Sequence, residues 1–165
     1  MPALFESLSF RRGPAMKNRF MLAPLTNQQS HADGVLSDDE FRWLTMRAEG
    51  GFGLTMTCAA SVQDGGQGFP GQLGAHDDRH IPGLARLASA LRAQETHAVL
   101  QLHHAGMRSP ATLIGRQPLC PSANAETNAR AMTLAEIEQT RDDFIAAARR
   151  CERAGFDGVQ LHGAH

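Results

Sequence analysis

The stretch His97-Ala98-Val99-Leu100-Gln101-Leu102, followed directly by His103 and His104, decides the fold class. It is a short, mainly apolar run of the length of a buried strand, and polar side chains gather at its carboxyl end. Longer amphipathic segments lie on both sides of it, one from Ile81 to Glu95 and one that begins near Thr133. A buried strand between two helices is typical of a parallel sheet with right-handed crossovers. The sequence therefore predicts an α/β fold.

The same alternation of short apolar and longer amphipathic segments runs along the whole chain. Two segments, Ser37-Asp38-Asp39-Glu40 and Thr133-Leu134-Ala135-Glu136, have the form of a capping box, in which the glutamate reaches back to the cap. The pattern predicts four strands and three intervening helices. The expected strands are 19–24, 53–59, 97–102 and 158–162, and the expected helices are 38–49, 81–95 and 134–154.

Two α/β architectures compete. A doubly wound sheet normally carries phosphate-binding glycines in its first strand-to-helix turn, and the turn Pro24–Gln29 has none. A (β/α)8 TIM barrel places its functional residues at the carboxyl ends of the strands. This chain has such residues there: Thr26, Ala60-Ser61, Gln101 with His103, and His162 with His165.

The length indicates half of such a barrel. A complete barrel needs ~250 residues, and the chain has 165. We expect residues 1–165 to form the N-terminal half-barrel, with the remaining strands missing. Residues 1–18 are expected to form an N-terminal hairpin or arm, in which Leu4 to Met16 crosses the barrel floor. The unpaired edge of the fourth strand predicts association, so we expect a homo-oligomer.

Charge and cysteine content exclude several classes. The net charge of −1 gives no reason to expect nucleic acid or an anionic membrane as a partner. The N-terminus lacks the apolar run of a signal peptide or a membrane span. The cysteines Cys58, Cys120 and Cys151 are odd in number and widely spaced, which favours a reducing, cytoplasmic location and no metal site. Cys58 and Cys151 are expected to be inert packing residues.

Four ordered motifs resemble the old yellow enzyme family of FMN-dependent ene-reductases. They are Lys17–Thr26 (KNRFMLAPLT), Gly65–Gly71 (GGQGFPG), Leu100–Gly106 (LQLHHAG) and Arg149–His165 (RRCERAGFDGVQLHGAH). The resemblance implies a TIM barrel that holds FMN noncovalently. It also implies that the full-length protein uses NAD(P)H to reduce activated C=C bonds of α,β-unsaturated carbonyl compounds, its small-molecule partners. The isolated 165-residue chain is expected to be inactive.

The resemblance also implies residues that contact FMN. Ala23, Pro24 and Leu25 would pack beside the flavin, and Thr26 would lie near its O4 edge. Ala60 would offer a backbone amide. Gln101 would match the mixed donor and acceptor edge of the pyrimidine ring, because an amide side chain both donates and accepts.

His162 and His165 are, by the same resemblance, the pair that holds the substrate carbonyl oxygen. Side chains at i and i+3 of a continuous strand face opposite ways, so the pair converges only if the strand ends near Gly163. Two imidazole donors would stabilise the negative charge that develops on that oxygen. The residues alone favour a solvated strand terminus over half of a metal site, because lone histidine pairs are common and no acidic ligand lies nearby.

Several alternatives remain open. A flavin domain of a dienoyl-CoA reductase or an amine dehydrogenase would look similar over these residues. A second alternative is a noncatalytic half-barrel that associates with a partner. A third is a metal-dependent hydrolase that uses His103, His162 and His165. His103 fits either a substrate pocket or an exposed loop, and Arg108 is interpreted as a solvated charge.

Overall fold

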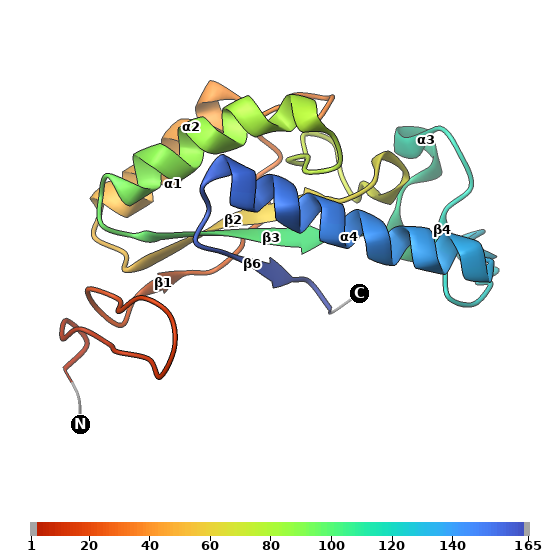
Figure 1. Ribbon diagram of the computed structural model, residues 1–165. Coiled ribbons are helices and arrows are strands. Elements are labelled where there is room, and N and C mark those ends of the chain that lie inside the picture. The colour runs from red at the N-terminus through yellow and green to blue at the C-terminus, as the bar shows by residue number, and fades with distance from the viewer. Residues whose placement is uncertain (1–2, 164–165) are drawn as a thin grey trace.

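The computed structural model describes residues 3–163, which form a four-stranded parallel sheet with helices on one face (Figure 1). The strands stand in the order β1-β2-β3-β6, and each pairs in parallel with the next. Their bounds are Met21–Leu22 for β1, Leu54–Ser61 for β2, His97–His103 for β3 and Gly158–Leu161 for β6. This order and direction are those of half a (β/α)8 barrel. His165, predicted to act with His162, lies outside the described residues.

Two strands are shorter than the sequence predicts. β1 covers only Met21 and Leu22 of the expected 19–24, because those two residues are the ones that pair with the start of β2. As the first strand of the sheet, β1 has a neighbour on one side only. β6 ends at Leu161, one residue before His162. The strand thus ends just before His162, whose backbone N–H still donates to the Leu102 carbonyl of β3.

Three long helices connect the sheet strands and lie on the same face of the sheet (Figure 1). They are α1 (Asp38–Glu49), α2 (Ile81–Arg92) and α4 (Leu134–Ala154). α2 ends before the predicted Glu95, because Glu95 adopts a φ of 53° in the left-handed region. A residue in that conformation cannot continue a right-handed helix.

The hydrophobic core fills the layer between the sheet and these helices. Leu100 and Leu102 of β3 are fully buried there, and so are Leu84, Leu87 and Leu91 of α2. Side chains alternate along a strand, so Val99, Gln101 and His103 face the opposite side of the sheet. Packing the leucines against the helices therefore turns the polar residues of β3 toward the other face.

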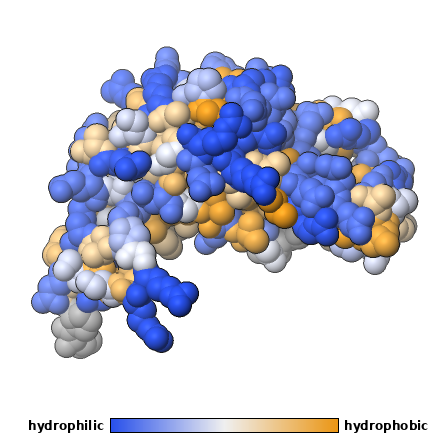
Figure 2. Space-filling view, in the orientation of Figure 1, coloured by the Kyte–Doolittle hydropathy of each residue, from blue (hydrophilic) through white to orange (hydrophobic). Residues whose placement is uncertain are grey.

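That other face of the sheet is open, since no helix of residues 3–163 covers it (Figure 1). Figure 2 shows hydrophobic residues along the lower margin of the molecule, beneath α4. In β6, Val159 is 39% and Leu161 66% exposed. Within residues 3–163, β6 is the last strand in the sheet order and has no neighbour on its outer edge, and these side chains are correspondingly exposed.

The N-terminus of α1 is only half a capping box. The Ser37 hydroxyl accepts the N–H of Glu40 at 3.1 Å, as predicted. The Glu40 carboxylate does not reach back; it is fully buried and accepts from the Ser30 hydroxyl and, at 2.8 Å, from the Cys58 thiol. Burial, followed by the nearby Glu40 charge, raises the pKa of Cys58 well above its ordinary value. Cys58 therefore keeps its proton and ties β2 to α1.

The capping box of α4 is complete. Thr133 accepts the N–H of Glu136, and the Glu136 carboxylate accepts the N–H of Thr133 at 2.8 Å. The same carboxylate takes two hydrogen bonds from the guanidinium of Arg130. The Arg130 hydrogen bonds, and then that of the Thr133 amide, lower the pKa of Glu136 to about 2. This network fixes where α4 begins.

Acid is expected to weaken this cap. The folded pKa of Glu136 lies below its ordinary value of 4.5, so its contribution to stability is present above pH 4.5 and is lost as the pH falls toward about 2. The variant Glu136→Gln should have a lower unfolding temperature than the wild type at pH 7. Between pH 4.5 and 2, its unfolding temperature should fall less than that of the wild type. Glu138→Gln, at an exposed position two residues further along the same helix, is the control. Equal pH profiles for the two variants would contradict the assignment.

The remaining segments lie at the two ends of the sheet. At the amino ends of the strands, one antiparallel bridge joins Leu8 to Met16, and His97 contacts the Ala15 carbonyl at 2.9 Å. The expected hairpin is thus a single bridge without a ladder. The sequence missed six short elements: η1 (Asp64–Gly66), η2 (Asp78–His80), η3 (Gly106–Arg108), α3 (Ala111–Ile114), β4 (Leu119–Cys120) and β5 (Arg130–Ala131). Within residues 3–163, none of the helices has the length and apolar character to cross a bilayer.

Candidate active site

A cavity of about 300 Å³ opens at the carboxyl ends of the four parallel strands. This is the size of a small-molecule site, and it lies at the end of the sheet where barrel enzymes carry their chemistry. Segments that follow all four sheet strands contribute to it. Its lining residues are Pro24, Thr26, Ala59, Gly68, Phe69, Gln101, His103, Ala105, Arg108 and His162.

A bulge in β2 brings Ala59 to the face of the sheet that carries Gln101. Met56 is the register partner of Val99, but Ala59 is the partner of Gln101, so β2 holds one extra residue between the two pairs. The Thr57 hydroxyl occupies the irregularity and accepts the Gln101 N–H at 3.3 Å. A bulge re-aims the side chains that follow it. Ala59 consequently shares the open face with Gln101.

Of the residues predicted to contact the flavin, some line the cavity and others do not. Pro24, Thr26 and Gln101 line the cavity. Ala60 is fully buried in the core on the helix side, one residue from Ala59, which lines the cavity instead. Ala23 and Leu25 are exposed and are not among the lining residues of the described chain. Their contacts with a flavin stay predictions.

Gln101 is held from the neighbouring strand. It is the register partner of Gln160 in β6, and its Nε2 donates to Oε1 of Gln160 at 2.7 Å. An amide side chain has two N–H donors and two acceptor positions on its oxygen. With one N–H directed to Gln160, the Gln101 side chain keeps capacity for a ligand with both donors and acceptors. The sequence does not predict a role for Gln160, because an exposed polar residue on a strand has no pattern that sets it apart.

His103 and His162 meet in the cavity. Their ring centroids are 4.8 Å apart with an interplanar angle of 63°, an edge-on contact. The backbone N–H of His162 donates to the Leu102 carbonyl at 2.9 Å, which extends the pairing of β6 with β3 by one step. His103 is buried, so of the two interpretations left open for it, the pocket is the correct one. The predicted convergence of His162 with His165 falls outside the described residues.

Arg108 also lines the cavity, from η3 after β3. The interpretation of this residue as an ordinary solvated charge is incomplete, because its exposed side chain borders the same space as His103 and His162. An arginine at the mouth brings a permanent positive charge to the site. In the sequence, the only indication that Arg108 belongs to the site is its position a few residues beyond the end of a strand.

The loop that carries Pro24 and Thr26 is fastened at its far end. The Ser30 N–H donates to the Gly71 carbonyl at 3.0 Å, and its hydroxyl donates to Glu40. Gly71 has a φ of 68°, and a Cβ there would lie 2.6 Å from the Gln28 carbonyl oxygen. Only glycine allows this approach. The glycine-rich run 65–71 thus forms the part of the cavity wall that Gly68 and Phe69 line.

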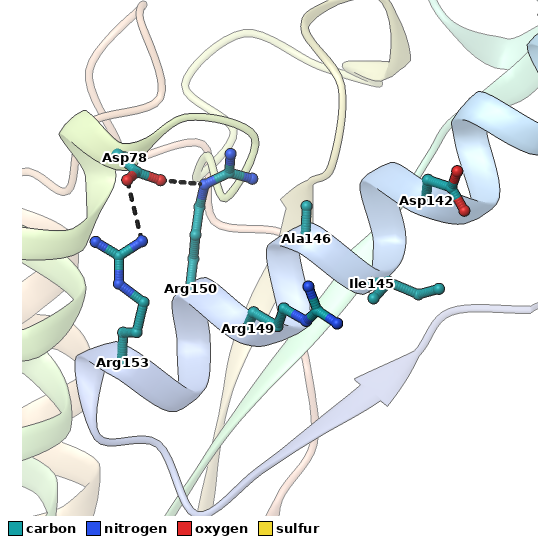
Figure 3. A pocket seen from close by; sticks show the side chains of 7 residues that line it. All are labelled: Asp78, Asp142, Ile145, Ala146, Arg149, Arg150 and Arg153. Carbon is teal, nitrogen blue, oxygen red and sulfur yellow. Dashed lines mark hydrogen bonds and ion pairs between the residues drawn. The ribbon is translucent and has the colours of Figure 1, made fainter.

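A second groove, drawn in Figure 3, lies along α4, away from the strand ends. Arg150 and Arg153 both reach Asp78 of η2, at 2.8 and 3.0 Å. These two hydrogen bonds lower the pKa of Asp78. The cluster joins α4 to η2 at the start of α2 on the outer surface, with Arg150 half-buried and Asp78 and Arg153 exposed, and we interpret it as a structural contact.

Two further histidines form a separate contact. His76 and His80 lie edge-on with centroids 4.6 Å apart, and their Nε2 atoms are 3.4 Å apart. Burial lowers the pKa of His80 to about 4, so it is neutral at pH 7. Among residues 3–163, no three His, Cys, Asp or Glu side chains gather in an arrangement that would hold a metal ion.

Comparison with known proteins identifies the family. Residues 3–165 match the NADH:flavin oxidoreductase / NADH oxidase family. The chain belongs to this family. It is 40% identical, over 98% of its length, to a probable NADH-dependent flavin oxidoreductase, YqiG, of Bacillus subtilis, and covers 44% of that protein. Members of the family are oxidoreductases that use FMN and NAD(P)H.

Solved structures confirm the half-barrel fold. An old yellow enzyme homologue from Zymomonas mobilis superposes with a TM-score of 0.88 at 32% identity over 98% of this chain, which covers 48% of that protein. Morphinone reductase in complex with tetrahydroNAD gives 0.87 at 27% identity over 98% of the chain and 49% of the enzyme. The chain thus spans about half the length of these relatives. The resemblance predicted from the four motifs is confirmed at the level of family and fold.

Proposed function

We propose that this chain is the FMN-contacting N-terminal half-barrel of an ene-reductase, which reduces activated C=C bonds of α,β-unsaturated carbonyl compounds with NAD(P)H. The observation that carries the proposal is the cavity at the carboxyl ends of β1, β2, β3 and β6. It combines apolar walls, an amide, a hydroxyl and two imidazoles. An apolar pocket with a few convergent polar groups is the usual form of a cofactor site.

The residues present fit a flavin. The buried amide of Gln101 can both donate and accept, and Thr26 adds a hydroxyl on the neighbouring wall. Pro24 and Ala59 supply apolar surface for a flat ring. FMN, when bound, supplies the hydride transfer itself. The protein supplies binding, orientation and electrostatics.

His162 is proposed to donate a hydrogen bond to the substrate carbonyl oxygen. It stands at the cavity wall, where the backbone bond to Leu102 fixes the start of its loop. A donor aimed at an oxygen on which negative charge develops lowers the barrier of the reaction. Arg108 at the same cavity favours the same charge.

The proposal predicts that Gln101→Leu weakens FMN binding. The variant removes the amide and leaves its ligand partners unpaired, at a cost of about 1–3 kcal/mol, which corresponds to roughly 5- to 150-fold in Kd. Quenching of FMN fluorescence measures the change. Gln94→Leu, at an exposed position, is the matched control and should bind as the wild type does. An unchanged Kd for Gln101→Leu would remove this residue from the cofactor site.

The reaction itself is tested under anaerobic conditions. The full-length protein, loaded with FMN, should lose its visible flavin absorption on addition of NADH or NADPH, and the absorption should return when cyclohexenone is added. Return of the colour with an enone, and none with the saturated ketone, supports the ene-reductase. Reduction by NAD(P)H without reoxidation by any activated alkene would contradict it.

A further inference from the structure

Gln72 is a buried residue that the proposed function does not use. Its side chain is 1% exposed and contacts three groups. Its Nε2 donates to the Ala59 carbonyl at 3.0 Å, and its Oε1 accepts the Gly68 N–H at 2.7 Å. A flipped amide would place oxygen against the carbonyl and N–H against N–H. Two backbone groups therefore fix which end of the amide is nitrogen.

The third contact of Gln72 determines the state of His103. The Gln72 Nε2 lies 3.1 Å from Nδ1 of His103. An amide NH₂ group has no acceptor, so Nδ1 must accept and cannot carry a proton. A neutral imidazole with an unprotonated Nδ1 carries its proton on Nε2. An imidazolium would bring two N–H groups face to face.

The surroundings hold the ring in this position. A Cβ on Gly68 would lie 3.4 Å from Cε1 of His103, so the wall of the cavity is in near contact with the ring. His162 meets the ring edge-on, and Arg108 lines the same cavity.

We propose that Gln72 is a positioning residue that keeps His103 as the neutral Nε2–H tautomer, and that His103 donates this N–H to an oxygen of the ligand in the cavity. The ligand class is a carbonyl or carboxylate compound, since such an oxygen accepts from a neutral imidazole and is favoured by Arg108. The ligand part rests on the proposed function, and the tautomer part does not. His103 would then add an imidazole donor to the one supplied by His162.

The tautomer is measured first, on the protein without added ligand. Long-range ¹⁵N–¹H NMR correlations show which ring nitrogen of each histidine carries the proton, and His103→Gln identifies the signals of His103 by their loss. The expected result at pH 7 is a protonated Nε2 and an unprotonated Nδ1. A proton on Nδ1, or an equal mixture of the two tautomers, would overturn the proposal.

Gln72→Glu tests the cause. A carboxylate at this position accepts, so the proton of His103 should move to Nδ1 or the ring should become doubly protonated. Gln94→Glu makes the same change at an exposed site and should leave the His103 signals unchanged. If Gln72→Glu does not fold, Gln72→Leu removes the donor without adding charge, and both tautomers should then appear. A His103 spectrum identical to that of the wild type in every folded Gln72 variant would overturn the role of Gln72.

The ligand arm uses FMN-loaded protein and cyclohexenone. The Nε2 signal of His103 should shift on titration, while that of His31, an exposed histidine, should not. Binding of the enone without a shift at His103 would overturn its role as a donor. Failure of the protein to bind FMN would instead overturn the proposed function, and the tautomer measurement would still decide the assignment of Gln72 and His103.

Discussion

Leu100→Ala is expected to lower the free energy of unfolding by about 2–5 kcal/mol, the range for removing a fully buried leucine side chain. Leu100 is 0% exposed and lies on the central strand β3, on the side that faces the helices. The cost combines the lost burial of three carbons and their hydrogens with the cavity left behind. The rigid strand limits how far the neighbouring helices can collapse into that space.

Urea unfolding of Leu100→Ala and of the control Val99→Ala measures the difference between the two faces of β3. Val99 is the preceding residue, is half-buried and points to the open face. Its truncation should cost clearly less than that of Leu100. Equal losses in the two variants would mean that the core does not lie on the helix side alone.

In the full-length, FMN-loaded protein, His162→Ala is expected to slow enone reduction roughly 100- to 1000-fold, the size seen when one donor to a developing oxyanion is removed. The effect should fall on kcat, because the interaction strengthens as charge develops on the oxygen. FMN affinity should change little. His162→Asn, which keeps an N–H donor, should recover part of the rate.

His31→Ala is the control for His162→Ala, since His31 is exposed and outside the cavity. Steady-state kinetics with NADPH and a series of enone concentrations separates kcat from KM. A rise in KM with unchanged kcat would assign His162 to ground-state binding only. No change in either constant would exclude it from the reaction.

The sequence was sufficient for the elements whose signals are local. The Thr133 to Glu136 capping box depends on residues three positions apart, and the leucine spacing of α2 reflects one helical face. The order of strands and helices then limited the topology to parallel pairing. These features follow from short-range geometry.

The features that the sequence did not predict depend on partners far along the chain. Glu40 has the spacing of a capping residue, but a buried contact with Cys58 takes its carboxylate away from the cap. The bulge in β2 that selects Ala59 over Ala60 exists only in the pairing with β3. Gln72 lies in a loop without any periodic pattern, and its proposed role depends on its contact with His103, 31 positions further along the chain. Such long-range contacts leave no local pattern.

Titration of the purified chain with FMN tests whether the cofactor binds in the cavity at the carboxyl ends of β1, β2, β3 and β6. Visible absorption, flavin fluorescence and intact mass are recorded on the same sample. We expect saturable binding of one FMN per chain, with a shifted absorption band and quenched fluorescence, and weaker binding by Gln101→Leu. A spectrum identical to that of free FMN at every protein concentration, with the intact mass of the chain confirmed, would contradict it.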